Sequence, residues 1–148
     1  MTRVYFGGAN DVPVPVYGAC PEKYIGIFRP ASGLWAIRGL TRIYFGGAAD
    51  QAVPANYQGL HAGAVQLGIF RDVSGLWAVR ETTRAYYGTT GDRAVPANYQ
   101  GLLEAKIAIF RENSGLWGVR GVTRLYFGTG DDLPVSGRAI NPSSPSVP

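Results

Sequence analysis

The chain repeats itself, and this repetition constrains its fold more than any other feature. The phrase Thr-Arg-x-Tyr-Phe/Tyr-Gly occurs four times, starting at Thr2, Thr41, Thr83 and Thr123. The phrase Ile-Phe-Arg, followed by Ser-Gly-Leu-Trp, occurs three times, starting at Ile27, Ile69 and Ile109. A period of roughly 41 residues is typical of propeller blades and related tandem arrays. We therefore expect one repeat domain over residues 1–137.

Each repeat predicts a β-hairpin followed by a third strand. Ile-Phe-Arg favours a strand, Ser-Gly is a turn signal, and Leu-Trp-Ala-Ile/Val-Arg favours a second strand. Thr-Arg-x-Tyr-Phe gives the third strand, which a glycine ends. The Val-Pro further on, as in Val14-Pro15, predicts an edge strand or an extended crossover, because proline lacks a ladder donor. The expected class is all-β and antiparallel.

The arrangement of these strands has two readings. The first two strands of a repeat are apolar on both faces, as in Leu67–Phe70 and Leu76–Val79. Such runs favour sheets that are buried on both sides, and stacked propeller-like blades would provide this. A β-trefoil-like fold also suits three units of this length and is the alternative, although it should show cleaner alternation along each strand.

The charge pattern favours an architectural role for arginine. The formal net charge is +4, but the basic residues are spread along the chain. Most of the arginines recur at fixed repeat positions, one column being Arg29, Arg71 and Arg111. We expect these columns to pair with a recurring Asp or with backbone carbonyls. No nucleic-acid partner is expected.

The repeat resembles the bacterial extracellular FG-GAP/VCBS-like repeats, on the motifs Val-Pro-x-x-Tyr, Ile-Ala-Ile-Phe-Arg-Pro-x-Ser-Gly-Leu-Trp and Thr-Arg-x-Tyr-Phe-Gly. The resemblance covers residues 2–135 and implies a β-propeller and an extracellular or cell-surface location. It also implies an Asp-rich calcium loop, from which this sequence departs. Asn56 and Gln58, and Asn98 and Gln100, stand where the family has carboxylates. Since neutral amides do not offset the dehydration of Ca²⁺, we expect no calcium site here and expect these amides to bond within the turn.

The residues that catalysis requires are scarce. The chain has one histidine and one cysteine, and its acidic residues are either the recurring Asp of each turn or scattered. We therefore expect no enzyme, no zinc site and no cofactor. No apolar run is long enough to cross a membrane as a helix, so no membrane span is expected.

The fourth copy of the third strand predicts either that the chain is a fragment of a longer array or that it completes its sheets by self-association with another copy. Three hairpins need only three such strands, and an unpaired strand exposes backbone donors and acceptors that a neighbouring chain can satisfy. The candidates are Thr2, Arg3, Val4, Tyr5 and Phe6 at one end and Thr123, Arg124, Leu125, Tyr126 and Phe127 at the other. Two chains of three and a half units would make a seven-bladed ring, and open contacts would make a filament.

The alternative function is a multivalent carbohydrate-binding lectin. Aromatic rings stack on sugars and guanidinium groups bond hydroxyls, so glycans are a second candidate partner. The candidates are Trp35, Trp77, Trp117, Arg38, Arg80 and Arg120. Against this interpretation, tryptophan in an apolar strand is more often part of the core. Residues 138–148 are rich in Ser and Pro and predict an extended tail.

Overall fold

The repeated phrases become strands of three separate sheets. The computed structural model describes residues 2–14, 16–17, 23–60 and 65–135. Within these residues the only helical element is a short 3₁₀ turn, η1 (Asp72–Ser74). The tail predicted for residues 138–148 lies outside the described residues. The fold is therefore all-β, as the strand pattern predicts.

Each sheet has four antiparallel strands in the same order. The first contains β1 (Val12–Pro13), β4 (Gly26–Arg29), β5 (Leu34–Ile37) and β6 (Thr41–Tyr44). The second contains β7 (Gln51–Ala52), β8 (Gly68–Arg71), β9 (Leu76–Val79) and β10 (Thr83–Tyr86). The third contains β11 (Arg93–Ala94), β12 (Ala108–Arg111), β13 (Leu116–Val119) and β14 (Thr123–Tyr126). A short ribbon of β2 (Val16–Tyr17) and β3 (Lys23–Tyr24) adjoins the first sheet in sequence.

The predicted hairpin and third strand are confirmed in every sheet. The phenylalanine of the first hairpin strand lies opposite the tryptophan of the second, the pairs being Phe28 and Trp35, Phe70 and Trp77, and Phe110 and Trp117. The predicted edge strand is also present, but it ends just before the Val-Pro. Val53 still donates its N–H to Gly68 O at 2.8 Å, and the proline that follows has no N–H to continue the ladder.

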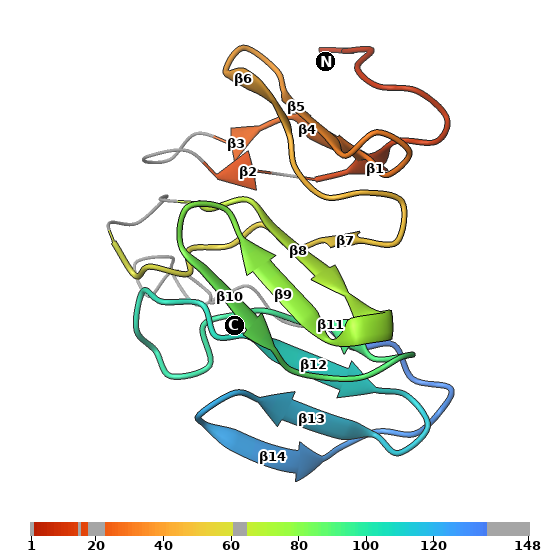
Figure 1. The fold of residues 1–148 in the computed structure, drawn as a ribbon, viewed down its shortest axis with the longest axis vertical. Coiled ribbons are helices and arrows are strands. Elements are labelled where there is room, and N and C mark those ends of the chain that lie inside the picture. Colours follow the sequence, from red (N-terminus) through yellow and green to blue (C-terminus); the bar gives the residue numbers. More distant parts are fainter. Residues whose placement is uncertain (1, 15, 18–22, 61–64, 136–148) are drawn as a thin grey trace.

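The sheets lie one above another in chain order, so the second is between the other two (Figure 1). Each internal junction has its own core. Phe28 and Trp35 of the first sheet share a cluster with Ile69 and Ala78 of the second. Phe70, Trp77 and Val79 of the second share the next cluster with Ile107 and Ile109. Burial on both faces of a sheet explains the continuous apolar runs.

None of the sheets closes on itself. A trefoil would need its strands to form a closed barrel, so the β-trefoil-like alternative does not describe the arrangement of residues 2–135. The chain instead forms an open array with two end faces. One is the outer face of the first sheet and the other is the outer face of the third sheet.

Candidate self-association surfaces

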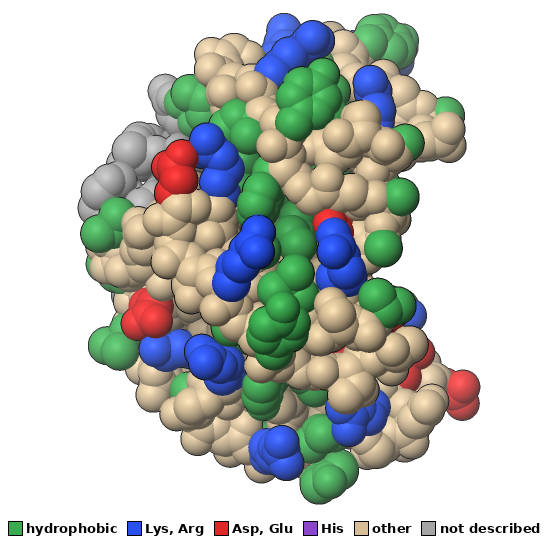
Figure 2. Space-filling model, viewed as in Figure 1, with side chains coloured by type: hydrophobic (Ala, Val, Ile, Leu, Met, Phe, Trp, Pro, Cys, Tyr) green, Lys and Arg blue, Asp and Glu red, His purple; other side chains and the backbone are tan. Residues whose placement is uncertain are grey.

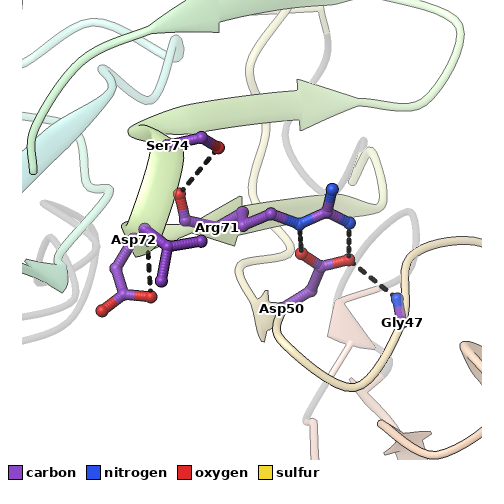
Figure 3. A network of polar contacts seen from close by, with 6 residues as sticks. Gly47, Asp50, Arg71, Asp72 and Ser74 are labelled. Atoms are coloured by element: carbon purple, nitrogen blue, oxygen red, sulfur yellow. Dashed lines mark hydrogen bonds and ion pairs between the residues drawn. The ribbon is translucent and has the colours of Figure 1, made fainter. Parts of the chain in front are cut away.

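An aspartate–arginine link fixes each junction between repeats. Asp50 follows the outer strand of the first sheet and reaches Arg71 of the second, with Nε–Oδ1 at 2.7 Å and Nη2–Oδ2 at 2.9 Å (Figure 3). The same carboxylate accepts the N–H of Gly47 at 2.7 Å. Asp92 is held in the same way by Arg111 and by the N–H of Thr89. The expectation that this arginine column pairs with the recurring Asp is confirmed.

The N-terminal copy of this link is also formed. Arg29 binds Asp11 with Nε–Oδ1 at 2.7 Å, and Gly8 donates its N–H to the same carboxylate. Hydrogen bonding from Arg29 holds the pKa of the Asp11 carboxyl below its ordinary value. A lowered folded-state pKa favours the link above the ordinary Asp pKa and weakens it as the pH falls below that value. The N-terminal segment is therefore fastened at neutral pH.

The tryptophans tie adjacent strands together inside the array. Trp35 packs on Phe28 with ring centroids 4.9 Å apart, and its indole N–H donates to Phe45 O at 2.8 Å. Trp77 repeats this with Phe70 and the carbonyl of Tyr87. Both indole side chains are fully buried, at 0% exposure. In this arrangement neither ring offers a face to a sugar.

The other glycan candidates do not join the tryptophans at a surface. Arg38 and Arg120 are exposed just beyond their strands, and Arg80 pairs with Glu81 at 2.9 Å. Trp117 is partly buried on the open face of the third sheet. Since each tryptophan points into or over the core and each arginine lies past the strand end, the geometry provides no combined ring-and-guanidinium site. A glycan role for these residues stays a prediction.

The end face of the first sheet exposes residues that the internal junctions bury. Ile25 is 47% exposed, whereas its repeat equivalents Leu67 and Ile107 are 8% and 7% exposed. Further along this face, Ile27, Leu34 and Ala36 are covered by Phe6. The first sheet therefore presents a partly covered apolar face with no sheet against it.

The end face of the third sheet is more open. Leu125 is 45% exposed, whereas the equivalent Ala85 is 7% exposed. Phe127 is 76% exposed, whereas its equivalents Phe45 and Tyr87 are packed into junction cores. The fourth recurring aspartate, Asp132, accepts the N–H of Thr129 at 2.7 Å but has no arginine partner in the described part of the chain. This face has the surface of a junction without the neighbouring sheet.

The two predicted end strands differ in their pairing. Thr123–Tyr126 is β14, which pairs with β13 as the outer strand of the third sheet. Thr2–Phe6 forms no strand and pairs with none of the described strands. The surplus copy is thus the N-terminal one. Sequence reasoning left both ends open, although the hairpin phrase that precedes Thr123 is a signal that this copy has a strand to pair with.

One side face of the array combines tyrosine and arginine. The outer strands carry the exposed pairs Arg42 and Tyr44, Arg84 and Tyr86, and Arg124 and Tyr126. Figure 2 shows basic side chains on both sides of a band of hydrophobic side chains. Between the second and third sheets this region holds a shallow hollow of about 330 Å³, lined in part by Tyr86, Arg111 and Arg124. The ionisable side chains that line this hollow are those of Tyr86, Tyr87, Arg111 and Arg124.

The amide-containing loops use their polar groups to hold the fold. Tyr57 OH donates to Val53 O at 2.7 Å, and the Tyr57 N–H donates to Gln66 Oε1 at 2.8 Å. Tyr99 OH repeats the first bond with Val95 O at 2.6 Å, and burial raises the pKa of Tyr99 to about 12. Within the loop itself, the Gln100 N–H donates to Asn98 Oδ1 at 3.3 Å. The described residues contain no group of three or more His, Cys, Asp and Glu side chains placed to hold a metal ion.

Among the described residues there is no helix long and apolar enough to span a membrane. Comparison of the chain with protein-family models, with curated proteins and with solved structures found no match. Any statement on function therefore depends on the geometry of the array itself.

The internal links predict a measurable difference between equivalent aspartates. Asp50→Ala removes three hydrogen bonds from a buried carboxylate and leaves the Gly47 N–H without its acceptor. Because Arg71 is partly exposed and can turn to water, we expect a loss of about 2–3 kcal/mol, or roughly 4–10 °C in Tm. Asp132→Ala is the comparison, since it removes the equivalent turn contact, together with a bond from the Thr129 hydroxyl, and involves no arginine of the described residues. Equal losses in thermal unfolding would show that the ion pair adds nothing.

Proposed function

We propose that this chain is a non-catalytic structural module that associates with further copies of itself through the two end faces of its array. The observation that carries the proposal is the difference in burial between equivalent positions. Ile25, Leu125 and Phe127 are exposed at the ends, whereas their counterparts lie within the internal junctions. The ends are therefore the two halves of an interface that the chain already forms twice.

Tandem repeats normally end in a capping unit whose outer face is polar, since an apolar end face would otherwise contact water. Among the described residues, no polar unit of this kind covers either end face. Leu125 and Phe127 at one end and Ile25 at the other are apolar and exposed. Contact between the third sheet of one copy and the first sheet of another would cover Ile25 and the partly buried Trp117, and the hydrophobic effect favours that contact.

The match between the end faces is directional. The third sheet offers the Phe/Trp face, and the first sheet offers the face that carries Ile25 and Ile27. A heterologous contact of this kind closes into a ring or continues as a filament, depending on the rotation at each junction. Each chain contributes three sheets, so a ring of two chains would contain six sheets, whereas three and a half units per chain would give seven. Four to eight blades are usual in closed propellers.

The test compares a substitution on an end face with one elsewhere. Ile25→Glu places a charge on the first sheet's open face, and we expect it to weaken self-association by about tenfold or more, because the buried charge would have no partner. Val73→Glu is the control, since Val73 is similarly apolar and exposed but lies in η1 at the tip of a hairpin. Solution mass across a concentration series is the measurement.

Two outcomes would contradict self-association through the end faces. A wild-type chain that stays monomeric at every concentration would contradict the proposal. So would an equal response to Ile25→Glu and Val73→Glu, because association would then not depend on the end face. An extracellular location remains a prediction from the resemblance of the repeats.

A further inference from the structure

Two segments of the chain are nearly the same strand. Thr2–Gly7 reads Thr-Arg-Val-Tyr-Phe-Gly and Thr123–Gly128 reads Thr-Arg-Leu-Tyr-Phe-Gly, so they differ only at Val4 and Leu125. The second is β14 and pairs with β13. The first has no strand partner among the described residues. Each chain therefore contains two segments whose sequences could pair with β13 of the third sheet.

The N-terminal copy is already positioned for that place on a neighbouring chain. Phe6 packs on the first sheet, as Phe45 packs at the junction between the first and second sheets. A Cβ on Gly7 would lie 3.0 Å from Ile27 Cγ2, and one on Gly46 would lie 3.0 Å from Ile69 Cγ2. The link between Asp11 and Arg29 completes the correspondence. Residues 6–11 thus follow the path of an internal junction, and they direct Thr2–Tyr5 toward the position of a preceding sheet.

The C-terminal copy is less firmly held. All four residues of β14 are exposed, whereas β6 alternates between half-buried and exposed and β10 has one buried residue. Phe127 is exposed and Asp132 has no arginine among the described residues. Beyond its pairing with β13, little in the described chain holds β14 in place.

We propose that copies of this chain associate by strand exchange, in which Thr2–Tyr5 of one copy replaces β14 on β13 of the next. The inference rests on the proposed function, since it specifies how the two end faces join. By repeat equivalence the register places Val4 opposite Trp117 and Tyr5 opposite Leu116, as Leu125 and Tyr126 are now. The partner is a second copy of the chain, recognised by a strand whose sequence it already contains.

Exchange avoids a conflict that simple stacking would create. In a contact built like the internal junctions, the neighbour's Thr2–Tyr5 and the resident Thr123–Tyr126 would occupy the same place beside β13. Replacing one by the other exchanges backbone hydrogen bonds one for one, because the two strands are almost identical. The net stabilisation of the complex comes from burial of the end faces. The incoming strand also continues directly into the contacts that Phe6, Gly7 and Asp11 make with their own first sheet.

Proline substitutions in the full-length chain test which strand is used. Phe127 donates its N–H to Gly115 O at 2.9 Å, and alternate residues of an antiparallel strand face the partner in the same way. Leu125 therefore directs its N–H at β13, and Val4 would do so in the exchanged contact. Val4→Pro removes that donor from a residue that pairs with no described strand, so the unfolding temperature of the isolated chain should not change.

We expect Val4→Pro to weaken association by about tenfold or more. Val4→Leu, which makes the two strand sequences identical, should preserve association and serves as the control. Leu125→Pro loosens β14 and should leave association intact or strengthen it, because the place beside β13 becomes free. Solution mass across a concentration series is the readout, with thermal unfolding measured on the same samples.

The opposite pattern would overturn the inference. If Val4→Pro associates like the wild type while Leu125→Pro does not, then β14 stays in place and the N-terminal strand is displaced. Ile25→Glu separates this failure from failure of the proposed function. Loss of association in Ile25→Glu but not in Val4→Pro would preserve end-face assembly and reject strand exchange. Retained association in both variants would reject both proposals.

Discussion

Replacing Trp77 by alanine is expected to cause one of the largest losses of stability of any single substitution in this chain. Trp77 lies in the central sheet, is fully buried, packs on Phe70 with ring centroids 4.8 Å apart and donates to Tyr87 O at 2.9 Å. The substitution removes the ring, leaves a cavity and deprives that carbonyl of its donor. We expect a cost of about 3–5 kcal/mol, or roughly 8–16 °C in Tm.

Trp117→Ala provides the internal comparison. Trp117 occupies the same repeat position, with Phe110 at 5.0 Å and a bond to Phe127 O at 3.0 Å, but it is only partly buried because no sheet covers it. Its loss should therefore cost about 1–2 kcal/mol, measured by thermal unfolding at a concentration where the chain is monomeric. Equal costs for the two variants would mean that the neighbouring sheet contributes little to the burial of Trp77.

Much of the sheet architecture could be predicted from the sequence, because the residues that form each hairpin lie close together within a repeat. Phe28 and Trp35 flank a Ser-Gly turn, so the hairpin and its cross-strand pair follow from sequence distance alone. The pairing of Arg71 with Asp50 was also foreseeable as a repeating column of opposite charges. The hairpin needs only local geometry, and the ion pair could be inferred because the same two residue types recur in every repeat.

The end faces could not be predicted in the same way. Ile25, Leu67 and Ile107 occupy the same position of the repeat, so the sequence predicts the same environment for each. The order in which the sheets stack makes Ile25 different, because no sheet packs against that side of the first sheet. The tryptophans allowed either a core or a sugar-binding interpretation for the same reason, because the sequence of an apolar strand does not determine whether another sheet packs on it. Burial of Trp35 and Trp77 depends on long-range packing between sheets, which no local pattern encodes.

Gly33 lies in the turn before the second hairpin strand, and we expect its substitution to be the other costly one. Gly39 of the same sheet is the control. Gly33 has φ of +68°, and a Cβ there would lie 2.2 Å from the carbonyl oxygen of Gly46. Gly39 in the same sheet has φ of +77°, but a Cβ there would meet nothing within 4 Å. Glu81, at the repeat position equivalent to Gly39, adopts φ of 58° with a full side chain.

Gly33→Ala should therefore be far more costly than Gly39→Ala. Both carry the penalty of a left-handed backbone, about 1–2 kcal/mol, but only Gly33→Ala forces the outer strand away from its neighbour. That movement would break the bond from the Phe45 N–H to Gly33 O at 2.8 Å and the bond from the Trp35 indole to Phe45 O. We expect a total above about 3 kcal/mol, seen in denaturant unfolding. Similar midpoints for the two variants would show that backbone conformation, and not the close approach of the two chain segments, requires glycine at position 33.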